Sequence, residues 1–278
     1  MSLLSVENLD ITFGRRRIPA VRGVSFSLDA GERLGLIGES GSGKSVTALA
    51  VMGLLPENAH VSGSVAFKGR EVVGASDKVL SDLRGDEMTM VFQEPMTALD
   101  PTMTAGRQVA EVVRLHAGAD PGAARQRVLD ILAEVGLPDP ARAADAYPHE
   151  LSGGQRQRIM MAMALVNRPD LVICDEPTTA LDVTVQARVL ALLDEELDAA
   201  GAACLFISHD LAVVSQVCDQ VMVMWRGEIV ETGSVAQVLG DPRHGYTRGL
   251  VATARLDLAR PGSRLPVVED YWTGGGRP

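Results

Sequence analysis

The stretch that decides the fold runs from Gly38 to Ser45 and reads GESGSGKS. An apolar run, RLGLI at 33–37, precedes it, and a segment with helical spacing starts at Lys44. Glycines followed by Lys and Ser, between a strand and a helix, are typical of a phosphate-binding loop. The glycines let backbone N–H groups turn toward an anion, and the positive end of the helix dipole points to the same place. The sequence therefore predicts a site for a nucleoside triphosphate.

The side chains of this loop add specific chemistry to the prediction. The candidate binding residues are Gly38, Glu39, Ser40, Gly41, Ser42, Gly43, Lys44 and Ser45. The Lys44 ammonium can bind the β- and γ-phosphate oxygens, and the Ser45 hydroxyl can ligate Mg²⁺. A dinucleotide-binding loop is a poorer alternative, because GSGKSV lacks the third glycine of that pattern.

Strand and helix patterns alternate along most of the chain. Predicted strands occupy 33–37, 171–174, 204–207 and 221–225, and predicted helices occupy 44–55, 154–167, 185–199 and 211–217. Such alternation indicates a parallel sheet with helices on its faces. From Pro95 to about Pro148, helical spacing broken by prolines replaces the alternation. This segment predicts an inserted helical subdomain.

The composition excludes several classes of protein. Of the 278 residues, 46% are hydrophobic and 22% charged, as in a folded chain, and the net charge of −10 argues against a large nucleic-acid surface. The three cysteines form no CxxC pair and are expected to be buried thiols. The longest apolar runs, 46–55 and 159–166, fall short of the roughly 20 residues that span a bilayer. Because the start of the chain also lacks the features of a signal peptide, we expect a soluble, cytosolic chain.

Two acidic residues, Asp175 and Glu176, end the predicted strand at 171–174. A buried carboxylate is costly without a partner, and Mg²⁺ at the phosphate loop is the natural one for Asp175. The next side chain along a strand faces another way, so Glu176 can polarise an attacking water molecule. Taken alone, the pair could equally be a solvated strand end. The phosphate loop favours the catalytic interpretation.

His209 follows the predicted strand at 204–207. A lone histidine at a strand end is as often structural or merely exposed as it is functional. Ligands of open α/β folds bind at the carboxyl edge of the sheet, where this residue is expected. His209 could therefore contact the γ-phosphate or the attacking water.

A second candidate anion site is LSGGQ, at 151–155. Ser152, Gly153, Gly154 and Gln155 begin a predicted helix and offer backbone amides to an anion. The alternative is a capped helix start without a ligand. A single nucleotide cannot obviously use both this helix start and the phosphate loop of one chain. We therefore hypothesise a sandwich of two chains, each presenting LSGGQ to the nucleotide that the other holds.

With these motifs in order, the chain resembles the ATP-binding cassette (ABC) ATPases over nearly its whole length. The resemblance implies an α/β P-loop NTPase fold with a mostly parallel core sheet, an antiparallel β subdomain and an inserted α-helical subdomain at about 95–168. It implies ATP as ligand and makes GESGSGKS the Walker A motif, LVICDE at 171–176 the Walker B motif, and 180–182 the D-loop.

The same resemblance implies roles for individual residues. Glu176, His209 and Gln93, the Q-loop glutamine, are the implied catalytic residues, and Ser45, Gln93 and Asp175 the implied Mg²⁺ ligands. Asp182 of the D-loop belongs to the implied nucleotide-binding set. Phe13 sits where the family has an aromatic residue that stacks on adenine, although a core phenylalanine is nearly as good an interpretation.

Longer blocks are similar to the ATPases of oligopeptide and dipeptide importers, a group that also includes nickel importers. They are GESGSGKSVTALAVMGLLP, VFQEPMTALDP, YPHELSGGQRQR, DEPTTALDVTVQA and GYTRGL. The first block is typical of the D-type subunit. The implied partners are a sister ATPase (with a homodimer when isolated), two membrane-spanning permeases and, indirectly, an extracytoplasmic binding protein. The implied location is peripheral, at the cytoplasmic face of the inner membrane.

The resemblance also gives domain boundaries: a nucleotide-binding domain at 1–255 and a C-terminal tail at 256–278. Many relatives carry cysteines in this tail, in some with an iron–sulfur cluster, whereas no cysteine follows Cys218 here and no cluster is expected. Two alternatives remain: a non-transport cassette ATPase of translation or DNA repair, and a regulatory module that binds nucleotide without turnover. The sequence does not specify the transported substrate.

Overall fold

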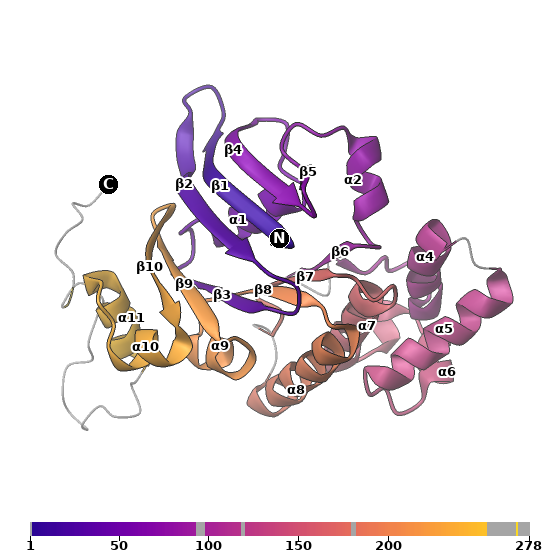
Figure 1. The fold of residues 1–278 in the computed structure, drawn as a ribbon. Coiled ribbons are helices and arrows are strands. Elements are labelled where there is room, and N and C mark those ends of the chain that lie inside the picture. Colours follow the sequence, from indigo (N-terminus) through magenta and orange to yellow (C-terminus); the bar gives the residue numbers. More distant parts are fainter. Residues whose placement is uncertain (1, 93–97, 118–119, 179–181, 255–270, 272–278) are drawn as a thin grey trace. The chain divides into compact units, whose positions relative to one another are not determined.

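The computed structural model describes residues 2–92, 98–117, 120–178, 182–254 and 271 (Figure 1). Its strands form two sheets, in the orders β2-β1-β4-β5 and β10-β9-β3-β8-β7-β6. The chain divides into two compact units. The first consists of Met1–Leu3, Leu28–Glu32 and Gly74–Leu205, and the second of Leu4–Ser27, Arg33–Val73 and Phe206–Pro278.

The second unit contains an antiparallel sheet, drawn in indigo and purple in Figure 1. Its strands are β1 (Leu4–Phe13), β2 (Ile18–Leu28), β4 (Ala59–Phe67) and β5 (Arg70–Glu71). Strand β1 pairs antiparallel with β4, so that Leu4 lies opposite Phe67. Both side chains are fully buried, as are those of Leu9 and Ile11 in β1. The predicted antiparallel subdomain is confirmed.

The strands β3 (Arg33–Ile37), β9 (Gln220–Trp225) and β10 (Glu228–Ser234) also belong to the second unit. Strand β9 pairs in parallel with β3 and antiparallel with β10. The helices of this unit are α1 (Lys44–Val51), α9 (Leu211–Val217), α10 (Val235–Gly240) and α11 (Gly245–Ala254). Helix α9 packs on β3 and on α11. The strand–loop–helix expected around GESGSGKS is thus present.

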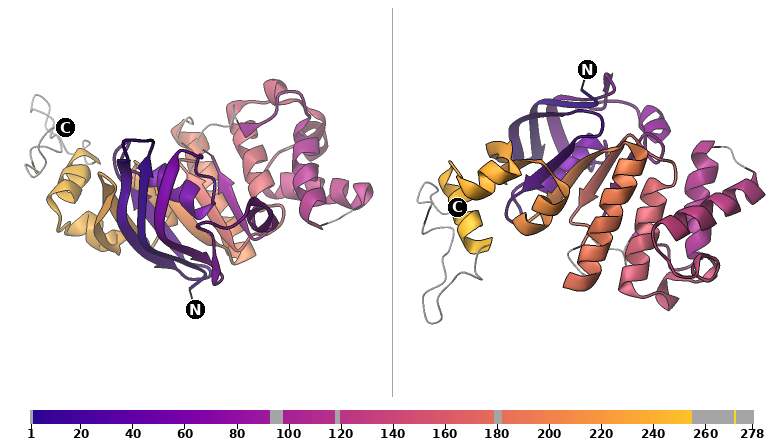
Figure 2. Two further views of the ribbon diagram at one scale, coloured as in Figure 1. Left: turned by 90° about the horizontal axis from the view of Figure 1, so that it is seen from above. Right: turned by 60° about the horizontal axis from the view of Figure 1, so that its bottom comes forward.

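In the first unit, β6 (Met88–Val91) pairs in parallel with β7 (Leu171–Asp175). All residues of β7 are buried, as are those of β8 (Ala203–Ser208), which starts in this unit and ends in the other. Helix α7 (Gly153–Leu165) packs on β6 and runs beside α8 (Val183–Ala200) (Figure 2). Continuous apolar strands covered by helices are typical of a parallel sheet, so the predicted core is confirmed.

A helical cluster completes the first unit. Helices α4 (Ala105–Ala117), α5 (Pro121–Glu134) and α6 (Pro140–Asp145) pack on one another, and α4 and α5 also pack on α7. A 3₁₀ turn, η1 (Pro148–Glu150), precedes α7. Asp120 and Asp139 cap the starts of α5 and α6, each followed by proline at the first helical position. The cluster agrees with the predicted helical insertion, whose outer boundaries remain a prediction.

The structure departs from the predicted elements at a few places. Helix α1 ends at Val51 rather than Leu55, because Gly53 adopts a left-handed φ of 63° and the Leu54 N–H donates to the Leu49 carbonyl at 2.8 Å. Strand β10 and helices α10 and α2 (Asp77–Leu83) were not among the predicted elements.

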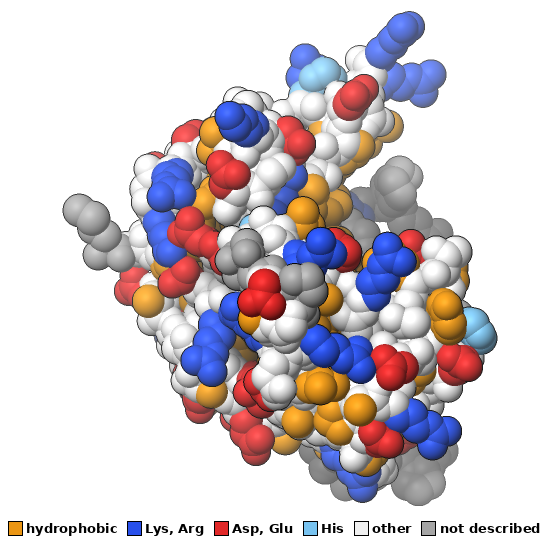
Figure 3. Space-filling model, turned by 90° about the vertical axis from the view of Figure 1, so that its right-hand side faces the viewer, with side chains coloured by type: hydrophobic (Ala, Val, Ile, Leu, Met, Phe, Trp, Pro, Cys, Tyr) orange, Lys and Arg blue, Asp and Glu red, His pale blue; other side chains and the backbone are white. Residues whose placement is uncertain are grey.

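The surface drawn in Figure 3 carries Lys and Arg side chains interspersed with Asp and Glu side chains. All three cysteines are buried, as predicted. Within the described ranges, the helices are too short or too polar to cross a membrane.

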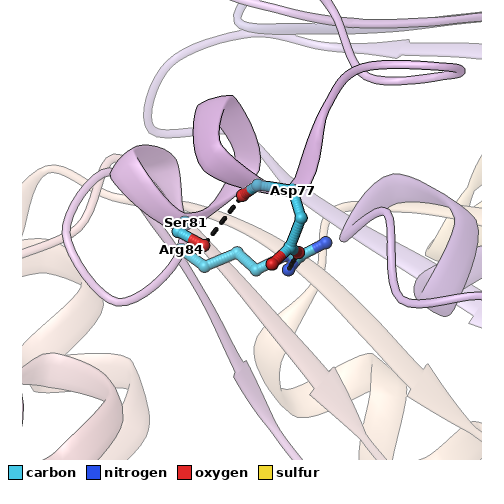
Figure 4. A network of polar contacts seen from close by, with 3 residues as sticks. All are labelled: Asp77, Ser81 and Arg84. Carbon is cyan, nitrogen blue, oxygen red and sulfur yellow. Dashed lines mark hydrogen bonds and ion pairs between the residues drawn. The ribbon is translucent and has the colours of Figure 1, made fainter.

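Helix α2 shows how short elements of the first unit are fixed locally (Figure 4). The Ser81 Oγ donates to the Asp77 carbonyl at 2.8 Å, and Arg84 Nη1 donates to Asp77 Oδ1 at 3.0 Å. Leu80 and Leu83 are the buried residues of this helix.

Candidate nucleotide-binding site

The phosphate loop connects the buried strand β3 to helix α1 in the second unit. Gly43 is the residue before the first helical turn and has a φ of 110°, a region that side chains rarely adopt. A Cβ at Gly43 would lie 2.6 Å from the Ala20 carbonyl oxygen and 2.8 Å from Met224 Cε. The loop is thus fixed between β2 and β9 in a conformation that suits glycine.

Lys44, the first residue of α1, is only 4% exposed. Its Nζ donates to the Gly38 carbonyl at 2.8 Å and to the Glu39 carbonyl at 2.9 Å. These carbonyls help to offset the cost of burying a cation. The lysine therefore lies against the loop itself, at the positive end of α1.

The loop also contains a buried hydroxyl, Ser42 Oγ, without a hydrogen-bond partner among the described residues. A buried ammonium, a helix N-terminus and an unpartnered hydroxyl in a glycine-lined turn suit an anion such as a phosphate. Glu39, Ser40, Gly41 and Ser45 are exposed. The residues present thus fit the predicted triphosphate, with Ser45 placed in the first turn of α1 as a candidate oxygen ligand for Mg²⁺.

One contact to this loop was not predicted from the sequence. The Glu39 N–H donates to the hydroxyl of Tyr246, in helix α11, at 2.9 Å. Tyr246 belongs to the GYTRGL block, which was singled out only by its resemblance to importer ATPases. No local pattern pairs this tyrosine with the phosphate loop.

His209 lies directly after β8, and its side chain is exposed. Ser208 Oγ accepts a hydrogen bond from the Asp210 N–H at 3.0 Å, and Asp210 Oδ1 accepts from the Ala212 N–H at 2.8 Å. These bonds fix the turn into α9. Phe13 is partly exposed at the end of β1, opposite Ala59, and its stacking on adenine stays a prediction.

The Walker B residues lie in the first unit. Asp175 ends β7 and is only 6% exposed. Glu176 adopts a left-handed φ of 48°, which costs an L-residue roughly 1–2 kcal/mol. Pro177 follows it, and a proline further restricts the preceding residue. The predicted catalytic carboxylate thus lies at an uncommon backbone conformation. Such conformations cluster at functional positions.

The LSGGQ segment begins helix α7 in the first unit. Ser152 Oγ accepts from the Gln155 N–H at 3.3 Å, and Gln155 Oε1 accepts from the Ser152 N–H at 2.9 Å. This reciprocal cap matches the simpler interpretation of a capped helix start. Ser152 and Gly153 are nevertheless exposed. Both interpretations of the motif therefore remain compatible with the geometry.

A hollow of about 410 Å³ lies beside this helix start, wholly within the first unit. Ser152, Gly154 and Gln155 line it, together with the cationic side chains Arg158 and Arg188. A helix N-terminus flanked by two arginines is an electropositive surface. It suits an anionic ligand.

The remaining predicted residues are only partly described. Asp182 caps helix α8, accepting from the Thr184 and Val185 N–H groups at 3.0 Å each. Gln93 and the D-loop residues Ala180 and Leu181 lie outside the described residues. The phosphate loop, Phe13 and His209 belong to the second unit, whereas Asp175, Glu176, Asp182 and 152–155 belong to the first.

Comparison with known proteins identifies the family. The chain matches the ABC transporter family over residues 21–179. It is 52% identical over 254 residues to the peptidoglycan transport ATP-binding protein YejF of Agrobacterium fabrum, covering 90% of this chain and 46% of that protein. It is 47% identical over 255 residues to the oligopeptide transport ATP-binding protein OppD of Bacillus subtilis, covering 90% of this chain and 71% of that protein. The chain spans just under half the length of some of these relatives.

Among solved structures, the fold matches the dimeric ATP-binding cassette MJ0796 bound to ADP and Pi in a post-hydrolysis state. The TM-score is 0.74 at 28% identity, covering 84% of this chain and 98% of the other. The chain belongs to the ABC transporter family. The predicted cassette fold and the resemblance to the D-type ATPases of peptide importers are thereby confirmed.

Proposed function

We propose that this chain binds and hydrolyses ATP as the ATP-binding subunit of an importer for peptides or related small molecules. The observation that carries the proposal is the phosphate loop, where the buried Lys44 begins α1 beside a glycine-lined turn. A buried ammonium beside backbone amides at a helix N-terminus suits a triphosphate.

Within the proposal, the chain's own residues act on ATP as follows. Lys44 and the loop amides bind the β- and γ-phosphates, and Phe13 stacks on the adenine. Ser45, Asp175 and Gln93 would hold Mg²⁺, which would neutralise phosphate charge. Their hydroxyl, carboxylate and amide oxygens are the ligand types that this ion prefers.

Glu176 acts as the general base in the proposed reaction. It accepts a proton from water as the water oxygen bonds to the γ-phosphorus and the bond from that phosphorus to the bridging oxygen breaks. The products are ADP and phosphate, and the proton passes from the carboxylate to solvent or product. Glu176 also orients this water, His209 stabilises the charge on the transferred group, and Gln93 reports the state of the nucleotide.

The exposed start of α7 supports a second part of the proposal. Ser152, Gly153, Gly154 and Gln155 serve the nucleotide held by a sister ATPase, with Asp182 near the same interface. The dimeric cassette among the structural relatives supports such a pair. Two permeases and an extracytoplasmic binding protein complete the proposed assembly, which places this chain at the cytoplasmic face of the inner membrane. The names of the relatives favour peptides as the transported class.

Two substitutions test the activity. Lys44→Ala should abolish retention of ATP, whereas Glu176→Gln should retain ATP and release little phosphate. Glu195→Gln is the matched control, since Glu195 is an exposed carboxylate of α8 outside the proposed site. Phosphate release and filter retention of labelled ATP are measured for each protein. A Glu176→Gln protein with normal turnover would refute the assigned base, and a wild-type protein that binds ATP without turnover would favour the regulatory alternative.

The sandwich is tested by association. Glu176→Gln protein mixed with its sister ATPase should form a larger species in light scattering when ATP and Mg²⁺ are added. Adding Ser152→Arg to the variant should abolish that shift. If ATP produces no association, the proposed sandwich is wrong even where ATP binding persists.

A further inference from the structure

The hydroxyl of Tyr246 reaches the phosphate loop from helix α11, 207 positions further along the chain, and both segments belong to the second unit. The hydroxyl accepts the Glu39 N–H at 2.9 Å, and the tyrosine side chain is fully buried. Glu39 follows Gly38, where the chain leaves β3. At this end of the loop Lys44 of α1 holds the Gly38 and Glu39 carbonyls, and the tyrosine is the partner of the Glu39 N–H.

The surroundings of Tyr246 fix its ring in place. Trp225 of β9 lies against it, with ring centroids 5.9 Å apart and planes tilted by 43°. Burial raises the pKa of Tyr246 to about 12, so the hydroxyl is protonated at neutral pH. The Glu39 amide is therefore held by a neutral, buried oxygen of fixed position.

Helix α11 is in turn anchored to strand β10. The carboxylate of Glu231 is almost buried and accepts the Arg243 N–H at 2.8 Å and the His244 N–H at 2.9 Å. These amides lie immediately before α11, and the Tyr246 N–H donates to His244 Nδ1 at 3.3 Å. Hydrogen bonds thus lead from β10 through the start of α11 to the phosphate loop.

We propose that Tyr246 is a positioning residue for nucleotide binding, whose hydroxyl fixes the start of the phosphate loop and makes its conformation depend on the docking of α11. The inference rests on the proposed binding of ATP at this loop. When only a fraction of the molecules has the loop in its binding-competent conformation, the apparent affinity falls to that fraction of its intrinsic value. Fixing both ends of the loop removes that loss.

The Tyr246→Phe variant tests the inference because it keeps the ring and removes the hydroxyl alone. Thr253→Val is the matched control: it removes a hydroxyl of the same helix, which donates to the Leu250 carbonyl at 2.9 Å, away from the loop. Three measurements are made on both variants and the wild type. They are amide hydrogen exchange of peptides covering 38–45 without nucleotide, titration with a fluorescent ATP analogue and Mg²⁺, and steady-state turnover of ATP.

Tyr246→Phe should exchange faster at 38–45 and bind the analogue about 3- to 10-fold more weakly, the size expected for one net hydrogen bond. In turnover, KM for ATP should rise with kcat nearly unchanged. Thr253→Val should match the wild type in all three. Wild-type exchange and affinity in Tyr246→Phe, or equal changes in both variants, would overturn the inference. Failure of the wild type itself to bind the analogue would instead refute the proposed function.

Discussion

The substitution Gly43→Ala tests whether crowding, as well as hydrogen bonding, fixes the phosphate loop. Gly43 has a φ of 110°, and an added Cβ would lie 2.6 Å from the Ala20 carbonyl oxygen and 2.8 Å from Met224 Cε. The methionine methyl group ends a flexible side chain and can move aside. The Ala20 carbonyl belongs to the backbone of β2 and cannot move without disturbing the strand.

The expected loss of stability follows from these contacts. Forcing alanine into an uncommon backbone region costs about 1–3 kcal/mol, and an overpacked methyl group costs about 1–3 kcal/mol more. Alanine also restricts the unfolded chain, which offsets about 0.4–1 kcal/mol. The free energy of unfolding should therefore fall by about 1–6 kcal/mol, and the loop amides should lose their alignment for an anion.

Two other glycine substitutions separate strain from crowding. Gly41 has a φ of 80° and no atom within 4 Å of an added Cβ, so Gly41→Ala keeps the strain alone. Gly153 begins α7 with open space around it and no positive φ, so Gly153→Ala should be nearly neutral. Urea unfolding followed by circular dichroism gives the order of stability, and Gly43→Ala should lose most. If Gly43→Ala loses no more than Gly41→Ala, crowding by β2 does not fix the loop.

Three further predictions concern stability alone. Burial would raise the pKa of Glu231, but hydrogen bonds from two backbone amides and from the side chains of Thr247 and Gln237 together outweigh it, so the pKa lies below its ordinary value of 4.5. The ionised Glu231 therefore contributes stability above pH 4.5, and this contribution is lost as the pH falls through the lower pKa of the folded protein. The difference in melting temperature between wild type and Glu231→Gln should shrink from pH 7 to pH 3. A constant difference would contradict this prediction. Ser152→Ala removes the cap of α7 and should cost about 1 kcal/mol in urea unfolding, whereas Ser152→Asp should restore most of it; equal stability of all three proteins would show that the cap contributes nothing. Arg84→Ala should cost less than about 1 kcal/mol, because the paired carboxylate of Asp77 is 86% exposed; a larger loss would mean that Arg84 acts through other contacts.

The sequence predicts those parts of the fold in which a local pattern determines the backbone. The glycines of 38–43 specify the turn into α1, and the uninterrupted apolar runs of β7 and β8 indicate buried strands. The candidate site is predictable to the same extent. Lys44, Asp175 and Ser152 are recognised by the elements that they begin or end.

Strand β10 could not be predicted in this way, because it is a strand only through its pairing with β9. Residues 229–231 include a buried carboxylate, Glu231, which weakens any apolar alternation. Arg226 and Gly227 make the turn with φ values of 49° and 87°, the left-handed pair that a tight hairpin needs. Arginine is not a usual residue at such a position, so the hairpin carried no clear signal.

Within the phosphate loop, too, some contacts are encoded by the local sequence and others come from a distant part of the chain. The motif itself encodes the left-handed φ of Gly43 at the α1 end and the bond from Lys44 Nζ to the Gly38 carbonyl at the β3 end. The Glu39 N–H at the β3 end depends instead on Tyr246, which lies 207 positions away and becomes its neighbour only when α11 docks. A buried hydroxyl needs a hydrogen-bond partner, but that partner can come from any part of the chain. The sequence separation of such a pair is therefore not fixed. The motif therefore identifies the loop, whereas Tyr246 is identified only by the hydrogen bond that the Glu39 N–H makes in the folded chain.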